Sequence, residues 1–153
     1  MINKLDNLDE AVAHQIFTVF QSAYKVEAHL IEASQFPPLL RTREDIQESA
    51  TLFYGVYESG CLAGVIEIAK KGKTLEIDSL TIEPSHFRKG IAGILIRYVL
   101  DSFEYAQAIV ETAVANGPAI SLYKKYGFVE FKRWTPSHGI PKLAMSVKKR
   151  PVC

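Results

Sequence analysis

The chain has 153 residues, of which 48% are hydrophobic and 23% are charged, and its 18 Lys and Arg residues nearly balance 17 Asp and Glu residues. These values are typical of an ordinary globular protein, and we expect a single domain over residues 1–153. The formal net charge of +1 gives no indication of nucleic acid or of an anionic membrane as a partner.

The N-terminal segment and the cysteines indicate the cellular compartment of the protein. Residues 1–10 lack the apolar stretch of a signal peptide, and no apolar run is long enough to span a bilayer. The cysteines are Cys61 and Cys153, too few for a disulfide framework, so we expect a reducing cytoplasm. The four histidines are isolated from one another, so no metal site is expected.

Helical patterns occupy the first fifty residues. Asn7 resembles an N-cap with Glu10 three positions on, and apolar residues then recur at helical spacing over 8–23, which predicts a helix of about four turns. A second helical stretch is predicted over 26–33, before the prolines that follow Phe36. A capping-box pattern predicts a short third helix over 42–49.

The hydrophobic period changes from helical to alternating at Leu52. An alternating run, a turn at 58–60 and a second run over 62–68 predict a β-hairpin. A further turn at 70–73 leads into a strand predicted over 75–83.

That strand carries an irregularity of parity. Leu75 and Ile77 lie on one parity, whereas Leu80 and Ile82 lie on the other, so one regular strand cannot turn all four toward the same core. One extra residue near 78–79, a β-bulge, would resolve this, and bulges are frequent beside active sites. A strand that is buried on both faces is the alternative.

The next segment, 87–93, combines basic residues and glycines with the start of an apolar helix. Gly90 and Gly93 allow the backbone to approach a ligand closely, and the free amides of a helix N-terminus attract anions. Arg88 and Lys89 add positive charge. The pattern predicts a phosphate-binding loop, although a structural turn without a ligand is the alternative.

The remaining elements alternate between helix and strand. A helix is predicted from Ile91 to about residue 104, and a strand over 108–115. Asn116 then precedes Gly and Pro at the start of another helix, which Gly127 ends. Two final strands are predicted over 128–134 and 142–147.

This order of elements, together with specific residues, resembles the GNAT superfamily, the GCN5-related N-acetyltransferases. The matching segments are 80–84 and 88–93, followed by Asn116 and Ala119 ahead of Tyr123 and then Gly127-Phe128. Phe87 stands where the family usually has Gln or Arg. The resemblance covers most of the chain from about Leu52 onward.

The resemblance implies an α+β fold that is similar to an α/β/α sandwich. Its central sheet would be mixed and mainly antiparallel, with one bulged and splayed strand and flanking helices. The implied co-substrate is acetyl-CoA, with its pyrophosphate on the amides of the loop and its pantetheine arm along the strand. The implied donor-binding residues are Leu80, Thr81, Ile82, Arg88, Lys89, Gly90, Ile91, Ala92, Gly93, Asn116 and Tyr123.

The family's chemistry suggests roles for two side chains. Tyr123 occupies the position of the acid that protonates the CoA thiolate, although it could be one more aromatic on a half-buried helix. Asp78 lies at the inferred bulge, where the family often has an acidic residue, and is the candidate base. A solvent-facing Asp78, with a water relay in place of a side-chain base, is the alternative.

The function that the resemblance implies is N-acetyl transfer to a primary amine on a small molecule, peptide or protein. The acceptor would contact residues 24–41 and 135–141, where Glu27, Glu32 and Phe36, with Trp134 nearby, favour a cationic amine with an apolar body. A catalytically inactive CoA-binding sensor or regulatory module is the second hypothesis, and a phosphate-binding protein unrelated to CoA is the third. A homodimer through the final strands is left open.

Overall fold

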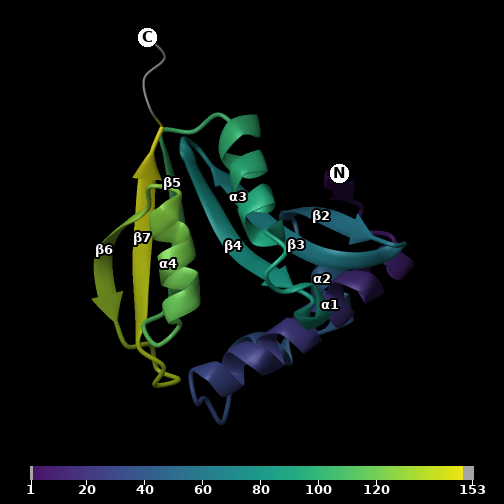
Figure 1. Cartoon of the computed structure of the whole chain (residues 1–153), viewed down its shortest axis with the longest axis horizontal. Coiled ribbons are helices and arrows are strands. Elements are labelled where there is room, and N and C mark those ends of the chain that lie inside the picture. The colour runs from purple at the N-terminus through teal and green to yellow at the C-terminus, as the bar shows by residue number, and fades with distance from the viewer. Residues whose placement is uncertain (1, 150–153) are drawn as a thin grey trace.

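The computed structural model describes residues 2–149. Over these residues the chain forms a seven-stranded sheet in the order β1-β2-β3-β4-β5-β7-β6 (Figure 1). Neighbouring strands are antiparallel except for β4 and β5, which are parallel. The strands are β1 (Ile2–Leu5), β2 (Leu52–Glu58), β3 (Cys61–Lys71), β4 (Thr74–Ile82), β5 (Gln107–Ala113), β6 (Val129–Trp134) and β7 (Lys142–Lys148).

Helices cover both faces of the sheet, each over its own apolar cluster. The α-helices are α1 (Glu10–Leu30), α2 (Arg43–Glu48), α3 (Ile91–Ser102) and α4 (Gly117–Lys125), and the short 3-10 helices are η1 (Pro37–Leu40) and η2 (Pro84–His86). One cluster buries residues of α1 and α2, such as Ile16, Phe20 and Ile46. The other buries residues of α3 and α4, such as Leu95 and Tyr123. The expected mixed, mainly antiparallel sheet with flanking helices is confirmed.

The N-terminal region differs from the sequence prediction. The two helices predicted over 8–23 and 26–33 are one helix, α1, because no Gly or Pro interrupts the chain between them. The apolar pattern fades after residue 23 because the end of α1 extends past β4 toward the far strands (Figure 1). Strand β1, which pairs with β2, was not predicted.

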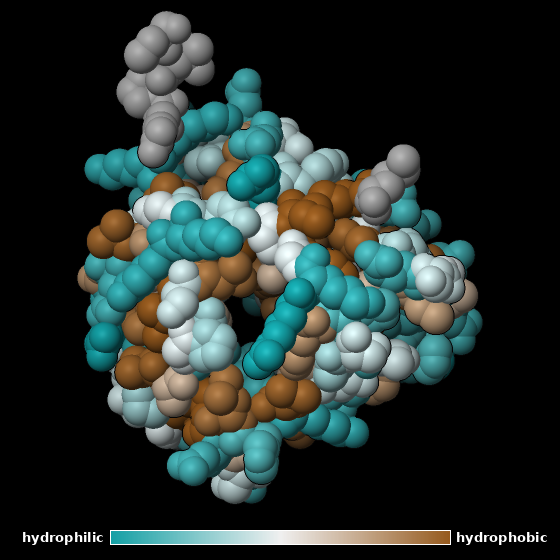
Figure 2. All heavy atoms as spheres, in the orientation of Figure 1, coloured by the Kyte–Doolittle hydropathy of each residue, from teal (hydrophilic) through white to brown (hydrophobic). Residues whose placement is uncertain are grey.

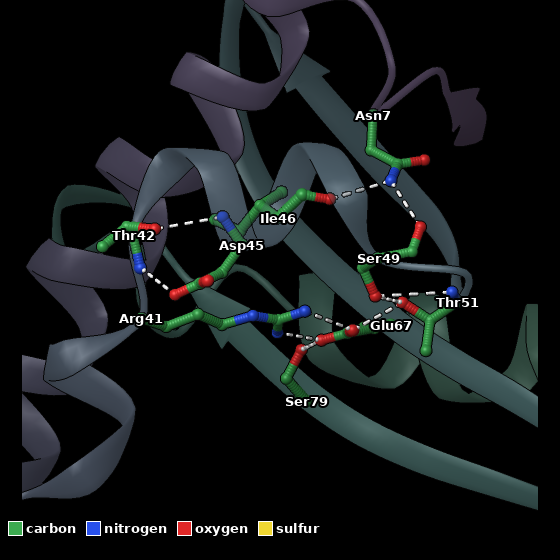
Figure 3. A network of polar contacts seen from close by, with 9 residues as sticks. All are labelled: Asn7, Arg41, Thr42, Asp45, Ile46, Ser49, Thr51, Glu67 and Ser79. Carbon is green, nitrogen blue, oxygen red and sulfur yellow. Dashed lines mark hydrogen bonds and ion pairs between the residues drawn. The ribbon is translucent and has the colours of Figure 1, made fainter.

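Asn7 is not the N-cap of α1. That role belongs to Asp9, whose side chain accepts hydrogen bonds from the amides of Ala11 and Val12. Asn7 instead donates to the carbonyls of Ile46 and Ser49, at 2.9 and 3.0 Å, and so ties the start of the chain to the end of α2 (Figure 3). Sequence spacing could not show a contact with residues this far along the chain.

Most other local predictions are confirmed. Thr42 and Asp45 form the capping box of α2, each bonding the other's backbone amide. The hairpin turns at Ser59 and Gly60, both with positive φ. Asn116 caps α4, and Gly127 follows it with φ of 91°.

Within the described residues, no helix combines the length and the apolar character that a membrane span requires. Cys61 is exposed and unpaired, and Cys153 lies outside the described residues.

Candidate functional site

The parallel strands β4 and β5 separate halfway along their length, and this splay creates the site (Figure 1). They pair from Thr74 with Gln107 as far as Ile77 with Val110. Beyond that point β4 stays paired with β3, and β5 stays paired with β7. The edge of β4 that faces β5 therefore has no neighbouring strand over residues 78–82.

The separation begins at a β-bulge in β4. Ile77 pairs with Ile68 and Ser79 pairs with Glu67, so Asp78 is an extra residue with no counterpart on β3. The bulge also resolves the parity problem, because all four apolar residues of β4, Leu75, Ile77, Leu80 and Ile82, belong to the same cluster. The predicted bulge is confirmed.

A cavity of about 440 Å³ occupies the splay, and Figure 2 shows the molecule hollowed through at this point. Because its lining comes from α1 on one face and α4 on the other, the cavity crosses the plane of the sheet. The strands contribute residues 77–80 and 110–113, and both segments expected to contact an acceptor contribute side chains, whereas Glu32 and Trp134 lie outside the lining. Strand β7 contributes Lys142, and the helices and loops contribute Tyr24, Glu27, Phe36, Pro37, Pro38, Arg41, Asn116, Ala119, Tyr123, His138 and Ile140.

The loop at 87–93 brings the N-terminus of α3 to the surface. Gly90 is the N-cap, with φ of 78°, and it offers no side chain to the helix. The first intrahelical bond runs from the amide of Ile94 to the carbonyl of Gly90, so the amides of residues 91–93 are free to donate hydrogen bonds to an external anion. Arg88 and Lys89 are exposed beside them, and Arg88 has an unusual φ of 65°.

A packing contact that the sequence did not indicate explains why residue 93 is a glycine. A Cβ atom at this position would collide with the hydroxyl oxygen of Tyr126, which follows α4. The glycine therefore allows α3 to pack against the end of α4.

Tyr123 is both a core aromatic and a cavity residue. Its ring is buried, lies edge-on to Phe128 at 5.4 Å between centroids, and lines the cavity. Burial, reinforced by Tyr24 and Glu27, raises the pKa of the Tyr123 phenol. The phenol therefore keeps its proton at neutral pH.

Asp78 is exposed and lines the cavity from the bulge. Partial desolvation, followed by the charges of Glu67 and Glu76, raises the pKa of Asp78 to about 6. A carboxylate with this pKa can accept a proton near neutral pH. Glu76 itself is paired with Lys71 at 2.9 Å.

Two further cavity residues, Tyr24 and Arg41, were not singled out from the sequence, whereas Glu27 was already expected on the acceptor side. Tyr24 and Glu27 lie three residues apart and so share one face of α1, a spacing that could have indicated them had the helix been predicted to continue. Burial raises the pKa of Glu27, against the influence of the Asn116 side chain and Lys142. Arg41 lies just after η1.

Comparisons with known proteins agree with this geometry. A family described as "Acetyltransferase (GNAT) domain" matches residues 19–149. The UPF0157 protein YqkA of Bacillus subtilis is 36% identical over 141 residues, which are 92% of this chain but 41% of that protein. The chain thus spans about two fifths of the length of that relative.

Two further proteins carry names that describe an acetyltransferase. The N-alpha-acetyltransferase RimI of Mycobacterium tuberculosis is 26% identical over 113 residues, which cover 71% of each chain. The PaiA N-acetyltransferase of Thermoplasma acidophilum, solved in complex with coenzyme A, superposes with a TM-score of 0.77 at 16% identity, covering 97% of this chain and 99% of that chain. At that identity the superposition shows a shared fold.

Proposed function

Because the chain belongs to the GNAT acetyltransferase family, we propose that it moves an acetyl group from acetyl-CoA to a primary amine by direct attack in a ternary complex. The observation that carries the proposal is the unpaired edge of β4 beyond its bulge, beside the start of α3, which has no side-chain cap. A donor with an amide-rich arm and a pyrophosphate would satisfy both groups of free backbone atoms at once.

The donor would lie along this edge. Its arm would pair with the backbone of Leu80, Thr81 and Ile82 as an added strand does. Its pyrophosphate would accept hydrogen bonds from the amides of Ile91, Ala92 and Gly93, with Arg88 and Lys89 supplying charge. The thioester end would then reach the cavity, which Asn116 and Tyr123 line.

The transfer needs one proton acceptor and one proton donor. The amine attacks the thioester carbonyl carbon and forms the C–N bond, while its surplus proton passes to Asp78, directly or through a water molecule. The C–S bond then breaks, and Tyr123 gives its proton to the departing thiolate. An amide of β4 near Leu80 would stabilise the oxyanion. Proton exchange with solvent restores both side chains before the next turnover.

The charges around the cavity favour a cationic acceptor. Glu27 and Asp78 line it, and neither makes an ion pair with any of the residues that the structure describes. The remaining charged side chains of the lining are already paired, as Arg41 with Glu67 and Lys142 with Glu111. The acceptor side also contains four apolar side chains, namely Phe36, Pro37, Pro38 and Ile140. We therefore propose an amine with an apolar body and no carboxylate of its own.

Calorimetric titration with acetyl-CoA, followed by thiol release with a panel of amines, tests the proposal. Wild type should bind the donor and release thiol. Tyr123→Phe should bind equally well and turn over at least tenfold more slowly, because general-acid catalysis contributes about 10²–10⁴-fold. Absence of binding at millimolar donor would refute the function. Binding without thiol release from any amine would instead support a CoA-binding sensor.

The acceptor class is tested with matched amines. Phenethylamine and phenylalanine share an apolar body, but only phenylalanine carries a carboxylate. In wild type, kcat/KM for phenethylamine should exceed that for phenylalanine by more than tenfold, because Glu27 would repel the carboxylate of phenylalanine. This preference should be smaller in Glu27→Gln. A preference for phenylalanine would contradict the assignment of acceptor class and leave the assignment of the donor intact.

A further inference from the structure

An ion pair with a buried carboxylate lies beside Ser79, the residue that follows the bulge (Figure 3). Glu67 of β3 is 2% exposed, and the guanidinium of Arg41 donates two hydrogen bonds to its carboxylate, at 2.6 and 2.9 Å. Thr51 donates to one carboxylate oxygen at 2.6 Å, and Ser79 donates to the other at 2.9 Å. All four donors converge on one carboxylate.

The pair joins two walls of the cavity. Arg41 follows η1, which carries part of the apolar acceptor wall, and Ser79 is the first residue after the bulge. The guanidinium carbon of Arg41 lies 5.7 Å from the ring centre of Phe20 and 5.9 Å from that of Phe53. These rings restrict the guanidinium to one position, so the location of η1 and that of the strand beyond the bulge depend on the same contact.

Glu67 is an unsuitable proton acceptor in spite of its position. Burial alone would raise the pKa of its carboxyl, but the hydrogen bonds from Arg41, Thr51 and Ser79 outweigh burial and lower it. Both oxygens are already engaged, so an attacking amine would find neither free. Glu67 can therefore influence the reaction only through the groups that it holds.

We propose that the Arg41–Glu67 ion pair is a positioning pair, which fixes the acceptor wall against β4 and tunes Asp78 as the proton acceptor. The inference rests on the proposed function, because it takes Asp78 to be the base. Glu67 acts on Asp78 through its negative charge and through Ser79, the next residue along the chain. Arg41 acts through its positive charge and through the position of η1.

The charges near Asp78 determine the sign of each effect. Asp78 is influenced by Glu67 and Lys71 of β3, by Glu76 of β4 and by Arg41, and the cavity also presents Glu27, Glu111, His138 and Lys142. Lys71 pairs with Glu76, and Lys142 pairs with Glu111, so a change in the Arg41–Glu67 pair leaves those two pairs intact. Without the charge of Glu67, Arg41 stabilises ionised Asp78. Without the charge of Arg41, Glu67 opposes that ionisation.

Charge-removing variants test the electrostatic part. The rate constant kcat/KM falls at low pH as the base becomes protonated. Glu67→Gln should move this acidic limb to lower pH by about 0.5–1 unit, and Arg41→Gln should move it to higher pH by a similar amount. The double variant should return the limb close to its wild-type position. The same acceptor amine is used for every variant, so the ionisation of the amine affects all of the pH profiles equally.

A second variant tests positioning and does not depend on a buried charge that has lost its partner. Ser79→Ala removes one hydrogen bond to Glu67, so kcat should fall several-fold while the acidic limb stays in place. Shifts of the limb in the same direction for both charge variants, or no shift in either, would overturn the electrostatic role. An unchanged kcat in Ser79→Ala would overturn the positioning role.

Failure of the mechanism can be told apart from failure of this inference. If Asp78→Asn retains the full acidic limb, Asp78 is not the base and the proposed mechanism fails. The carboxyl carbon of Asp78, assigned with that variant in protein labelled with ¹³C-aspartate, can still be titrated by NMR in both charge variants. Opposite shifts of its titration midpoint support the coupling, and coincident midpoints refute it.

Discussion

Substitution of Arg88 by glycine should separate stability from donor binding. Arg88 has φ of 65°, in the left-handed region, where a residue with a side chain is strained by about 1–2 kcal/mol. Glycine removes this strain but adds about 0.5–1 kcal/mol of backbone entropy to the unfolded chain. The net gain in the free energy of unfolding should be about 0.5–1 kcal/mol, which raises Tm by about 1–4 °C in a chain of this size.

The same substitution should weaken binding of acetyl-CoA. Arg88 is exposed beside the amides of residues 91–93, where a pyrophosphate would lie. Loss of one hydrogen bond between charged groups costs about 1.5 kcal/mol, so Kd should rise roughly tenfold. Thermal melting without ligand and calorimetric titration with acetyl-CoA measure the two effects independently.

Two matched variants complete the test at this position. Arg88→Ala removes the charge but keeps a Cβ atom at positive φ, so it should weaken binding without the gain in Tm. Arg88→Lys keeps both the charge and the strain, so it should bind nearly as wild type. If Arg88→Gly binds acetyl-CoA as tightly as wild type, the residue does not contact the donor. If it melts at a lower temperature, the argument from strain is wrong.

Three further predictions concern stability. Gly93→Ala should lower the free energy of unfolding by about 1–3 kcal/mol because its Cβ meets the Tyr126 hydroxyl, and Tyr126→Phe should relieve most of that loss. Asp78→Asn should raise stability at pH 7 by about 1 kcal/mol, after allowance for solvent screening, because folding raises the pKa of Asp78 to about 6. The gain should vanish below about pH 4, where the carboxyl is protonated in both states. Asn7→Ala should cost about 1–2 kcal/mol through the lost hydrogen bonds to α2.

Denaturant unfolding of each variant measures these three effects, and each has its own control. Tyr126→Phe alone should change stability little, and an equal loss for Gly93→Ala in both backgrounds would contradict the clash. A stabilisation by Asp78→Asn that is the same at pH 3.5 and pH 7 would contradict the electrostatic origin. The carboxylate of Asn7→Asp cannot donate hydrogen bonds, so this variant should be as unstable as Asn7→Ala. If Asn7→Asp is instead as stable as wild type, the side-chain amide does not have the proposed role.

The features that could be predicted from the sequence have local causes. The bulge followed from the parity of four residues in β4, the capping box of α2 followed from Thr42, and the end of α4 followed from Gly127. The uncapped start of α3 followed from Gly90. In each case the residues that determine the geometry are close neighbours in the chain, so spacing and residue type were sufficient.

The features that could not be predicted depend on contacts between distant segments. Glu67 meets Arg41, which lies 26 positions earlier, and nothing local to either residue indicates the other. Asn7 contacts the end of α2, and Gly93 faces Tyr126, for reasons that exist only in the folded chain. The end of α1 was mistaken for a separate helix because its apolar pattern fades where it leaves the sheet.

Several features that cost free energy lie around the splay between β4 and β5. Arg88 has a left-handed backbone, and the desolvated Asp78 resists ionisation. The buried hydroxyl of Thr81, in the part of β4 that no longer pairs with β5, has no hydrogen-bond partner among the residues that the structure describes. The neighbouring Glu67, by contrast, is buried with four hydrogen bonds. Because a stable fold alone does not require a strained loop, an unpaired strand edge and a partly desolvated carboxyl, their occurrence beside the splay between β4 and β5 supports the proposed function.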